Sequence, residues 1–305
     1  MKAVQFVLFI AVAIQNHAAF CEDKLPEGPG LSATYPSDAG IEKDPAVLFA
    51  DNFESGDLKK WAESSGNITI HDEKPNNGAK CVQSEMIRGK NQGGEAKKWF
   101  MPGADQVFAR VYVKFSADYQ YVHHFIWLSA NQKKNKWSSF GKAGLKPNGL
   151  THFSSGMEPW FAWGKNEPPG ELNLYTYYMD MEVDKKMNKY WGNGFFPPGP
   201  GKGQHAGPGK VIPKLDQWQC WEFMIKANTP GKADGEQAMW LDGKLAGHFT
   251  GIRWRDDADL KINCFWLEHY GFDPGDPTKQ YWKDKQTVWF DDVVIATRYI
   301  GHIAK

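Results

Sequence analysis

Hydrophobic and polar residues alternate in short runs along most of this chain, and a period of two is typical of half-buried β-strands. The cleanest run covers residues 106–115, where every second residue from Val107 to Val113 is apolar. An Asp-Gly pair at 242–243 separates two such runs and predicts a tight hairpin. Further strands are expected at residues 119–128, 218–227, 237–241, 245–250, 261–270 and 287–296. Because no amphipathic helix of ordinary length is apparent, we predict an all-β sandwich or jelly roll of two stacked antiparallel sheets.

The stretch at residues 171–182 is the most informative run, because its two faces differ in chemistry. One face is apolar and suits a core, whereas the other carries Asn173, Tyr175 and Tyr177. Tyrosine rings stack on sugars, donate hydrogen bonds and can transfer protons, although tyrosine is also simply common in sheets. We expect this strand to line a concave sheet, with the Gly- and Pro-rich segment 185–213 as one wall of the cleft.

The first residues have the features of an export signal. Lys2 precedes an apolar run at residues 3–14, and small residues follow. The run is shorter than the ~20 apolar residues that a membrane span needs. We therefore predict a signal peptide over residues 1–21, a flexible linker over 22–45 and one β domain over 46–303, in a secreted or periplasmic protein.

Composition narrows the choice of partners. The 36 basic and 36 acidic residues cancel, which removes the electrostatic argument for nucleic acid or an anionic membrane. The fourteen Trp and eleven Tyr residues suit a cleft that binds carbohydrate. We also expect the protein to be a monomer. Cys81, Cys220 and Cys264 have no zinc-site spacing, and a disulfide between the last two is left open.

Several motifs, taken in order, resemble a known family. They are DNFESG at 51–56, NTPGKADG at 228–235, WLDGKL at 240–245, GIRWR at 251–255 and WFDDVVIA at 289–296. Over residues 47–301 the chain resembles the concanavalin-A-like jelly-roll polysaccharide lyases, in particular the family-14 alginate or glucuronate lyases and the glucuronan lyases. The resemblance implies a concanavalin-A-like β-jelly roll that cleaves a uronic-acid polysaccharide by β-elimination, with no cofactor for catalysis.

In such a reaction a base removes the C5 proton, an acid protonates the leaving oxygen, and donors neutralise the substrate carboxylate. The alginate-lyase branch has two tyrosines after a Gly-Glu-Leu turn, so its roles carry over to Tyr175 and Tyr177, which follow Gly-Glu-Leu at 170–172. The family's lysine and its Ser-x-Arg pair have no counterpart, and a His-His pair at 123–124 follows the Tyr-Val-Lys-Phe strand instead. The histidines could substitute, or the substrate could differ, or catalysis could be lost.

We predict that Tyr177, supported by Tyr175, transfers protons while His124 neutralises the carboxylate. Since a free phenol has a pKa of about 10, Tyr177 needs a cation beside its oxygen to act as a base. The expected substrate-binding residues are Arg110, Lys114, Asn173 and His269.

A structural Ca²⁺ is expected near the ends of the domain, because carboxylate and amide oxygens suit this ion. Its predicted ligands are Glu54, Asn77, Asp291 and Asp292, and the plain alternative is that these acids are solvated.

Two other functions stay open. Asp180, Glu182 and Asp184 alternate, as the carboxylates of a glycoside hydrolase on this fold would. A non-catalytic, lectin-like carbohydrate-binding domain would explain the aromatic residues equally well.

Overall fold

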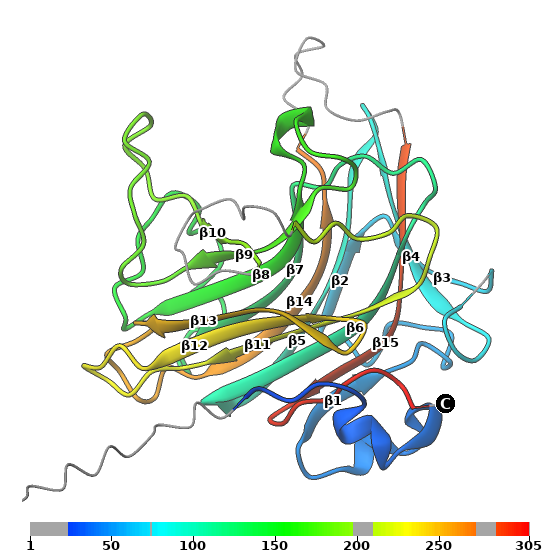
Figure 1. The fold of residues 1–305 in the computed structure, drawn as a ribbon, viewed down its shortest axis with the longest axis horizontal. Coiled ribbons are helices and arrows are strands. Elements are labelled where there is room, and N and C mark those ends of the chain that lie inside the picture. The colour runs from blue at the N-terminus through cyan, green and yellow to red at the C-terminus, as the bar shows by residue number, and fades with distance from the viewer. Residues whose placement is uncertain (1–23, 74, 198–209, 273–284, 305) are drawn as a thin grey trace, which may run out of the picture.

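The expected strands pair into two antiparallel sheets that pack face to face around one core (Figure 1). The structure is a computed structural model that describes residues 24–73, 75–197, 210–272 and 285–304. No α-helix occurs in these ranges. Their only helical turns are four short 3-10 segments, η1 (Gly30–Ala33), η2 (Pro36–Asp38), η3 (Ile41–Lys43) and η4 (Ala162–Gly164). The all-β jelly-roll prediction is confirmed.

The first sheet, sheet A, contains most of the regular strands predicted from the sequence. Its order is β4–β15–β6–β11–β12–β13, with β1 added beside β15 and β3 beside β4. These strands are β1 (Val47–Asp51), β3 (Ile68–His71), β4 (Cys81–Ile87), β6 (Gln106–Phe115), β11 (Gln219–Lys226), β12 (Gly235–Leu241), β13 (Lys244–Ile252) and β15 (Lys285–Ala296).

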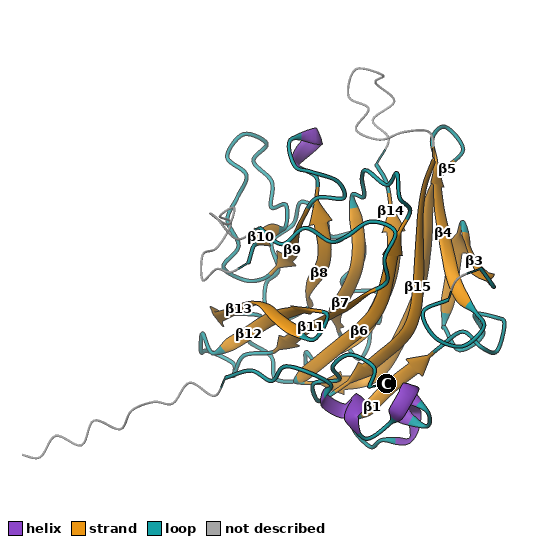
Figure 2. Cartoon of the chain, turned by 45° about the vertical axis from the view of Figure 1, so that its right-hand side comes forward, coloured by secondary structure: helices purple, strands orange, loops and turns teal. Residues whose placement is uncertain are grey.

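The second sheet, sheet B, carries the tyrosine strand. Its order is β10–β9–β8–β7–β14–β5, with β2 paired to β5, and the turn from β4 into β5 joins the two sheets. Its strands are β2 (Glu63–Gly66), β5 (Asn91–Ala104), β7 (His124–Asn131), β8 (His152–Trp160), β9 (Glu171–Tyr177), β10 (Asn193–Phe195) and β14 (Ile262–Tyr270). Figure 2 shows that the long strands of both sheets are curved.

The alternation in the sequence correctly divides the strands into faces. In β6, Val107 and Val111 are completely buried between the sheets, and in β9 Leu172 and Leu174 are buried in the same core. The β12–β13 hairpin turns at Asp242–Gly243, where both residues have positive φ, as an Asp-Gly turn of this kind requires.

The segment before the first strand differs from the predicted linker. Over the described residues of 22–45, the chain forms η1, η2 and η3, and Leu31 and Ile41 are buried in a second apolar cluster. Figure 1 shows this blue segment beside the red C-terminal end of the chain. Leu31 donates its backbone N–H to Tyr299, which helps to hold the segment on the outer side of sheet A. The lack of periodicity in residues 22–45 predicts a flexible segment. Irregular turns can nevertheless pack in a fixed position when single apolar residues, here Leu31 and Ile41, are buried.

Three further expectations concern the signal peptide, membrane spans and the cysteines. The predicted signal peptide lies outside the described residues. Among the described helices, none is long and apolar enough to cross a membrane. Cys81, Cys220 and Cys264 are buried free thiols, so the disulfide left open above is not formed.

Candidate functional site

The outer face of sheet B, which points away from the core, carries the candidate site. Asn173, Tyr175 and Tyr177 project to this face of β9 because their neighbours at even positions fill the core. Gly156 of β8 lies opposite Tyr175, and a Cβ there would come within 2.8 Å of the Trp127 ring. Glycine at this position therefore lets the indole of Trp127 lie flat across the sheet.

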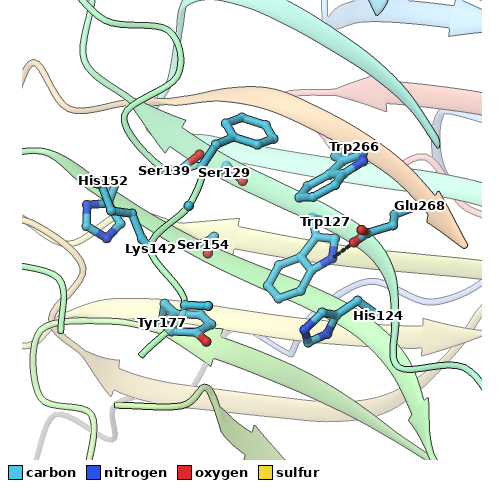
Figure 3. Close-up of a pocket in the computed structure, with 13 residues that line it drawn as sticks. His124, Trp127, Ser129, Ser139, Lys142, His152, Ser154, Tyr177, Trp266 and Glu268 are labelled. Atoms are coloured by element: carbon cyan, nitrogen blue, oxygen red, sulfur yellow. Dashed lines mark hydrogen bonds between the residues drawn. The ribbon is translucent and has the colours of Figure 1, made fainter. Parts of the chain in front are cut away.

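A pocket of about 170 Å³ opens on this face (Figure 3). Its floor includes Trp127 of β7, Trp266 of β14 and Tyr177 of β9, and the loop at 139–143 forms its other side. The rings of Trp127 and Trp266 are nearly parallel, with centroids 6.4 Å apart. Aromatic faces that line a pocket can stack on a sugar ring.

His124 forms the polar centre of one end of the pocket. Its Nδ1 lies 3.2 Å from Oε2 of Glu158, and its ring packs 5.2 Å from the rings of both Trp127 and Tyr175. Burial lowers the pKa of His124 to about 4 and raises the pKa of Glu158 well above its usual range. At neutral pH the imidazole is therefore uncharged, and one of its nitrogens carries a free electron pair.

The two tyrosines are coupled to each other. Their ring centroids are 5.7 Å apart, and burial raises the pKa of both phenols. Hydrogen bonds from Tyr175 and from the backbone of Gly192 and Gly144 oppose this shift at Tyr177. None of the main influences on the pKa of Tyr177 is a cation. The positive neighbour that a phenolate base requires is therefore not supplied by the described surroundings of Tyr177.

Glu268 of β14 is a second buried carboxyl group at the pocket. Its Oε2 accepts a hydrogen bond of 2.9 Å from Trp127 Nε1, and burial raises its pKa well above the usual range. Nearby, Lys97 of β5 pairs with Glu95 and lies 4.7 Å from the centroid of the Trp266 ring. This end of the pocket thus combines aromatic faces with buried carboxyl groups whose pKa values are raised.

The structure places three of the predicted substrate-binding residues elsewhere. Arg110 is completely buried on the far side of sheet A and pairs with Asp38. Lys114, on the same face, pairs with Asp216 at 3.0 Å. His269 points into the core, where its Nε2 lies 2.8 Å from the Tyr119 hydroxyl.

Alternation separated the faces of β6 and β14 correctly, but it does not show which sheet or which face carries the pocket. Arg110 and Lys114 lie on the outer face of β6 in sheet A, whereas the pocket lies on sheet B. In β14 the pocket is lined by Trp266 and Glu268, on the face opposite His269. Asn173 does lie on the site face, where its amide donates to the Glu158 carbonyl at 3.0 Å. This hydrogen bond links β9 to β8, and the role of Asn173 in binding substrate stays a prediction.

Sequence reasoning missed the residues that complete the pocket, namely Trp127, Lys142, His152, Trp266 and Glu268, and it missed Glu158, which contacts His124. The alternation from residue 263 to 270 does place Trp266 and Glu268 on one face. Glu158 and His152 share a strand with no regular pattern, since Gly156 and Pro159 interrupt it. No local signal marks them.

The expected calcium ligands come together only in part. Asp291 Oδ2 accepts from the Asn76 backbone N–H, and Asp292 Oδ2 accepts from the Asn76 side-chain amide, both at 2.8 Å. Glu54 instead accepts from the backbone of the neighbouring turn, at Ala79 and Lys80. No three His, Cys, Asp or Glu side chains gather as metal donors in the described part of the chain.

Asp291 and Asp292 are adjacent buried acids, and the pKa of Asp291 is raised by burial and by the charge of Asp292. A bound cation would relieve the repulsion between the two acids. The Asp291 and Asp292 oxygens therefore suit Ca²⁺ chemically, whereas Glu54 accepts from the turn, and the Asn77 amide donates to the Ser37 carbonyl at 3.2 Å.

The three alternating carboxylates on which the glycoside hydrolase alternative rested do not line a strand. Strand β9 ends at Tyr177, and Asp180 pairs with Arg253 at 3.4 Å. Glu182 is exposed, and Asp184 accepts from the backbone of the turn that follows it.

Comparison with solved structures agrees with this architecture, although no protein-family model and no curated protein sequence matches the chain. The marine PL-14 alginate lyase from Aplysia kurodai is similar, with 14% identity and a TM-score of 0.59, over 83% of this chain and 97% of that one. An alginate lyase from a Chlorella virus has 16% identity and a TM-score of 0.55, over 82% and 99%. A mutant of the alginate lyase Aly36B, in complex with an alginate trisaccharide, has 13% identity and a TM-score of 0.55, over 83% and 98%.

The chain has the jelly-roll fold of these alginate lyases. At such identities the likeness shows the fold alone, so the function must be argued from the side chains on sheet B.

Proposed function

We propose that this protein binds an acidic, uronic-acid polysaccharide on the outer face of sheet B and cleaves it by β-elimination. The fold supports a polysaccharide cleft, since similar structures are alginate lyases. The observation that carries the proposal is the cluster of His124, Glu158, Tyr175 and Tyr177 beside the pocket. It supplies both a proton acceptor and a proton donor next to aromatic faces that suit a sugar.

His124 is the base in this proposal. Because its pKa is about 4, it is neutral at pH 7 and ready to accept a proton. The role requires the tautomer in which Nδ1–H donates to Glu158, because this hydrogen bond fixes the ring and leaves the electron pair of Nε2 for the C5 proton of the substrate. When the imidazole becomes charged, the Glu158 carboxyl group can stabilise that charge.

Tyr177 is the acid. Burial raises its pKa, so the phenol keeps its proton until the glycosidic oxygen leaves. Tyr175 and the backbone of Gly192 and Gly144 then stabilise the phenolate by hydrogen bonding. These roles differ from the sequence-based prediction, which gave Tyr177 the proton abstraction and gave His124 only the neutralisation of the carboxylate. The change follows from the missing cation beside the Tyr177 oxygen.

We also propose that the protein is exported and acts as a monomer. The apolar run at residues 3–14 after Lys2 supports export. Expression of the whole chain, with N-terminal sequencing of the mature protein and size-exclusion chromatography, would test both points. A mature protein that retains residues 1–21, or a stable dimer, would contradict them.

The decisive assay compares two signals on alginate, glucuronan and related polyuronates. A lyase releases reducing ends together with the ultraviolet absorbance of the unsaturated uronate. We expect both signals, and we expect His124→Ala and Tyr177→Phe each to lower turnover by about 10²-fold, the scale of lost acid–base catalysis. His248→Ala is the matched control, because this histidine pairs with Glu236 on sheet A, away from the pocket. Full activity in the His124 or Tyr177 variant would refute its role.

The same assay decides between the remaining functions. Glu158 and Glu268 are two carboxyl groups at one cleft, and the pKa of Glu268 is raised partly by Glu158, so a glycoside hydrolase has a structural basis here. A hydrolase would release reducing ends without the ultraviolet signal. A lectin-like binder would give neither signal and still retain the polysaccharide.

A further inference from the structure

The two ends of the pocket on sheet B differ in chemistry. Figure 3 shows Trp127, Trp266, Glu268 and His124 on one side of the view. Its other side holds hydroxyl groups, an amine and a second imidazole, from Ser129, Ser139, Lys142, His152 and Ser154. The proposed acid and base do not use this second group, which we call the donor end.

His152 of β8 is buried at the donor end, with only 4% of its surface exposed. Its Nδ1 lies 2.9 Å from Thr151 Oγ1, and the Thr151 hydroxyl donates to Asn148 Oδ1 at 3.0 Å. Because the hydroxyl has one proton and gives it to Asn148, it must accept from Nδ1–H of His152. Nε2 of His152 therefore carries the free electron pair.

That nitrogen has no hydrogen-bond partner among the described residues, although it is buried. Leaving a buried acceptor unsatisfied is unfavourable, so such an atom at a pocket wall points to a ligand with a hydroxyl group. The pKa of His152 is lowered to about 4 by burial and by the nearby charge of Lys142, which keeps the imidazole neutral and able to accept.

Lys142 brings a positive charge to the same place. It belongs to the loop at 131–150, which contains five lysines and no acidic residue in a chain that is neutral overall. Two other lysines of this loop have carboxylate partners, Lys133 with Asp259 and Lys136 with Glu63. Lys142 lines the pocket, and no carboxylate of the described residues forms an ion pair with it.

We propose that the donor end is a subsite for a uronate residue, in which Lys142 binds the carboxylate and His152 Nε2 accepts a hydrogen bond from a ring hydroxyl. This proposal rests on the proposed function, because the same pocket holds His124 and Tyr177. A uronate carries a carboxylate and neighbouring hydroxyl groups on one ring, and the donor end offers a cation, serine hydroxyls and a bare acceptor. A neutral sugar would leave the ammonium group unpaired, so the subsite selects acidic residues.

The test measures binding separately from cleavage. Mannuronate, guluronate and glucuronate trisaccharides would be titrated calorimetrically into a Tyr177→Phe background, together with the carboxyl-reduced form of each. We expect at least one acidic trisaccharide to bind, and we expect Lys142→Met to weaken that binding about tenfold or more, with a smaller effect at high salt. Lys133→Met, a lysine of the same loop outside the pocket, should change it little.

His152 is tested by the type of group that replaces it. His152→Phe removes the acceptor and should weaken binding of both the acidic and the reduced trisaccharide about tenfold, whereas His152→Gln keeps an acceptor and should restore part of the affinity. Thermal unfolding of each variant identifies any that fails to fold. If His152→Phe does not fold, binding by the His152→Gln and Lys142→Met variants decides the proposal.

The outcomes separate the two proposals. If acidic trisaccharides bind in the expected pattern but the parent protein cleaves no polymer, the lyase function is wrong and the subsite stands. If the parent cleaves a polyuronate but Lys142→Met and His152→Phe bind like the background, the subsite is wrong and the function stands. Equal binding of acidic and reduced trisaccharides, or no binding of any acidic trisaccharide, would also overturn the subsite, whereas the cleavage assay alone decides the lyase function.

Discussion

Replacing Arg110 by Met should destabilise the protein strongly without touching the site. Arg110 is completely buried, and its Nη1 donates to Ser32 Oγ at 2.9 Å and to the Gly301 carbonyl at 3.2 Å. Its Nη2 donates to the Asp292 carbonyl at 3.1 Å, and the guanidinium pairs with Asp38. One side chain thus connects β6 and β15 with the segment before β1 and with the C-terminal end.

The magnitude follows from what the substitution leaves behind. Met fills much of the volume, but the Asp38 carboxylate becomes a buried charge without its partner. Breaking a buried ion pair on one side costs about 3–5 kcal/mol. For a domain of this size, each kcal/mol lowers Tm by about 2–4 °C, so a fall of roughly 6–20 °C is expected. Replacing Asp38 by Leu in the same variant removes the stranded charge and should recover part of the loss.

Thermal and urea unfolding would measure this loss, and Lys114→Met is the matched control. Lys114 lies on the same face of β6, but its partner Asp216 is exposed, so its loss should cost less than about 1 kcal/mol. Below the lowered Tm, the Arg110 variant should bind acidic trisaccharides like the parent. An Arg110→Met protein that unfolds at the parent's temperature but no longer binds would refute the structural role and restore the sequence-based prediction of a substrate contact.

Three further predictions follow from the site and its surroundings. Gly156→Ala should displace Trp127, because the added Cβ would lie 2.8 Å from its ring, and polyuronate binding measured by calorimetry should fall about tenfold or more. Calcium should raise Tm by a few degrees and EGTA should reverse this, whereas Asp292→Asn should abolish the response. If neither reagent changes the Tm of the parent, the prediction of a bound calcium ion is wrong. His152 and His269 have pKa values lowered by burial to about 4 and about 3, so the unfolded chain binds more protons below about pH 6.5. Each histidine should therefore contribute a loss of stability of up to about 1.4 kcal/mol per pH unit as the pH is lowered from about 6.5. Because the raised pKa values of Glu158 and Glu268 act in the opposite direction, urea unfolding of the parent and of His152→Gln should be compared across this range, and equal slopes would contradict the prediction for His152.

The sequence by itself determined the local structure, because short-range alternation and turn chemistry are properties of neighbouring residues. The predicted strand at 106–115 has the bounds of β6, and the Asp-Gly pair forms the β12–β13 turn. It also separated Tyr175 and Tyr177 from the apolar face of β9, since successive side chains point to opposite sides of any strand.

Only the tertiary structure decided which face meets the core and which distant residues meet each other. A period of two divides β14 into two faces but does not rank them, so His269 was assigned to the cleft that Glu268 occupies. His124 and Glu158 form a pair because β7 and β8 are adjacent, although 34 positions separate them in the chain. Arg110 became structural because a segment without any periodic signal folds over its strand and buries its charge. Burial then sets the pKa values that decide which group can act as acid or base, and burial is a property of the packed chain.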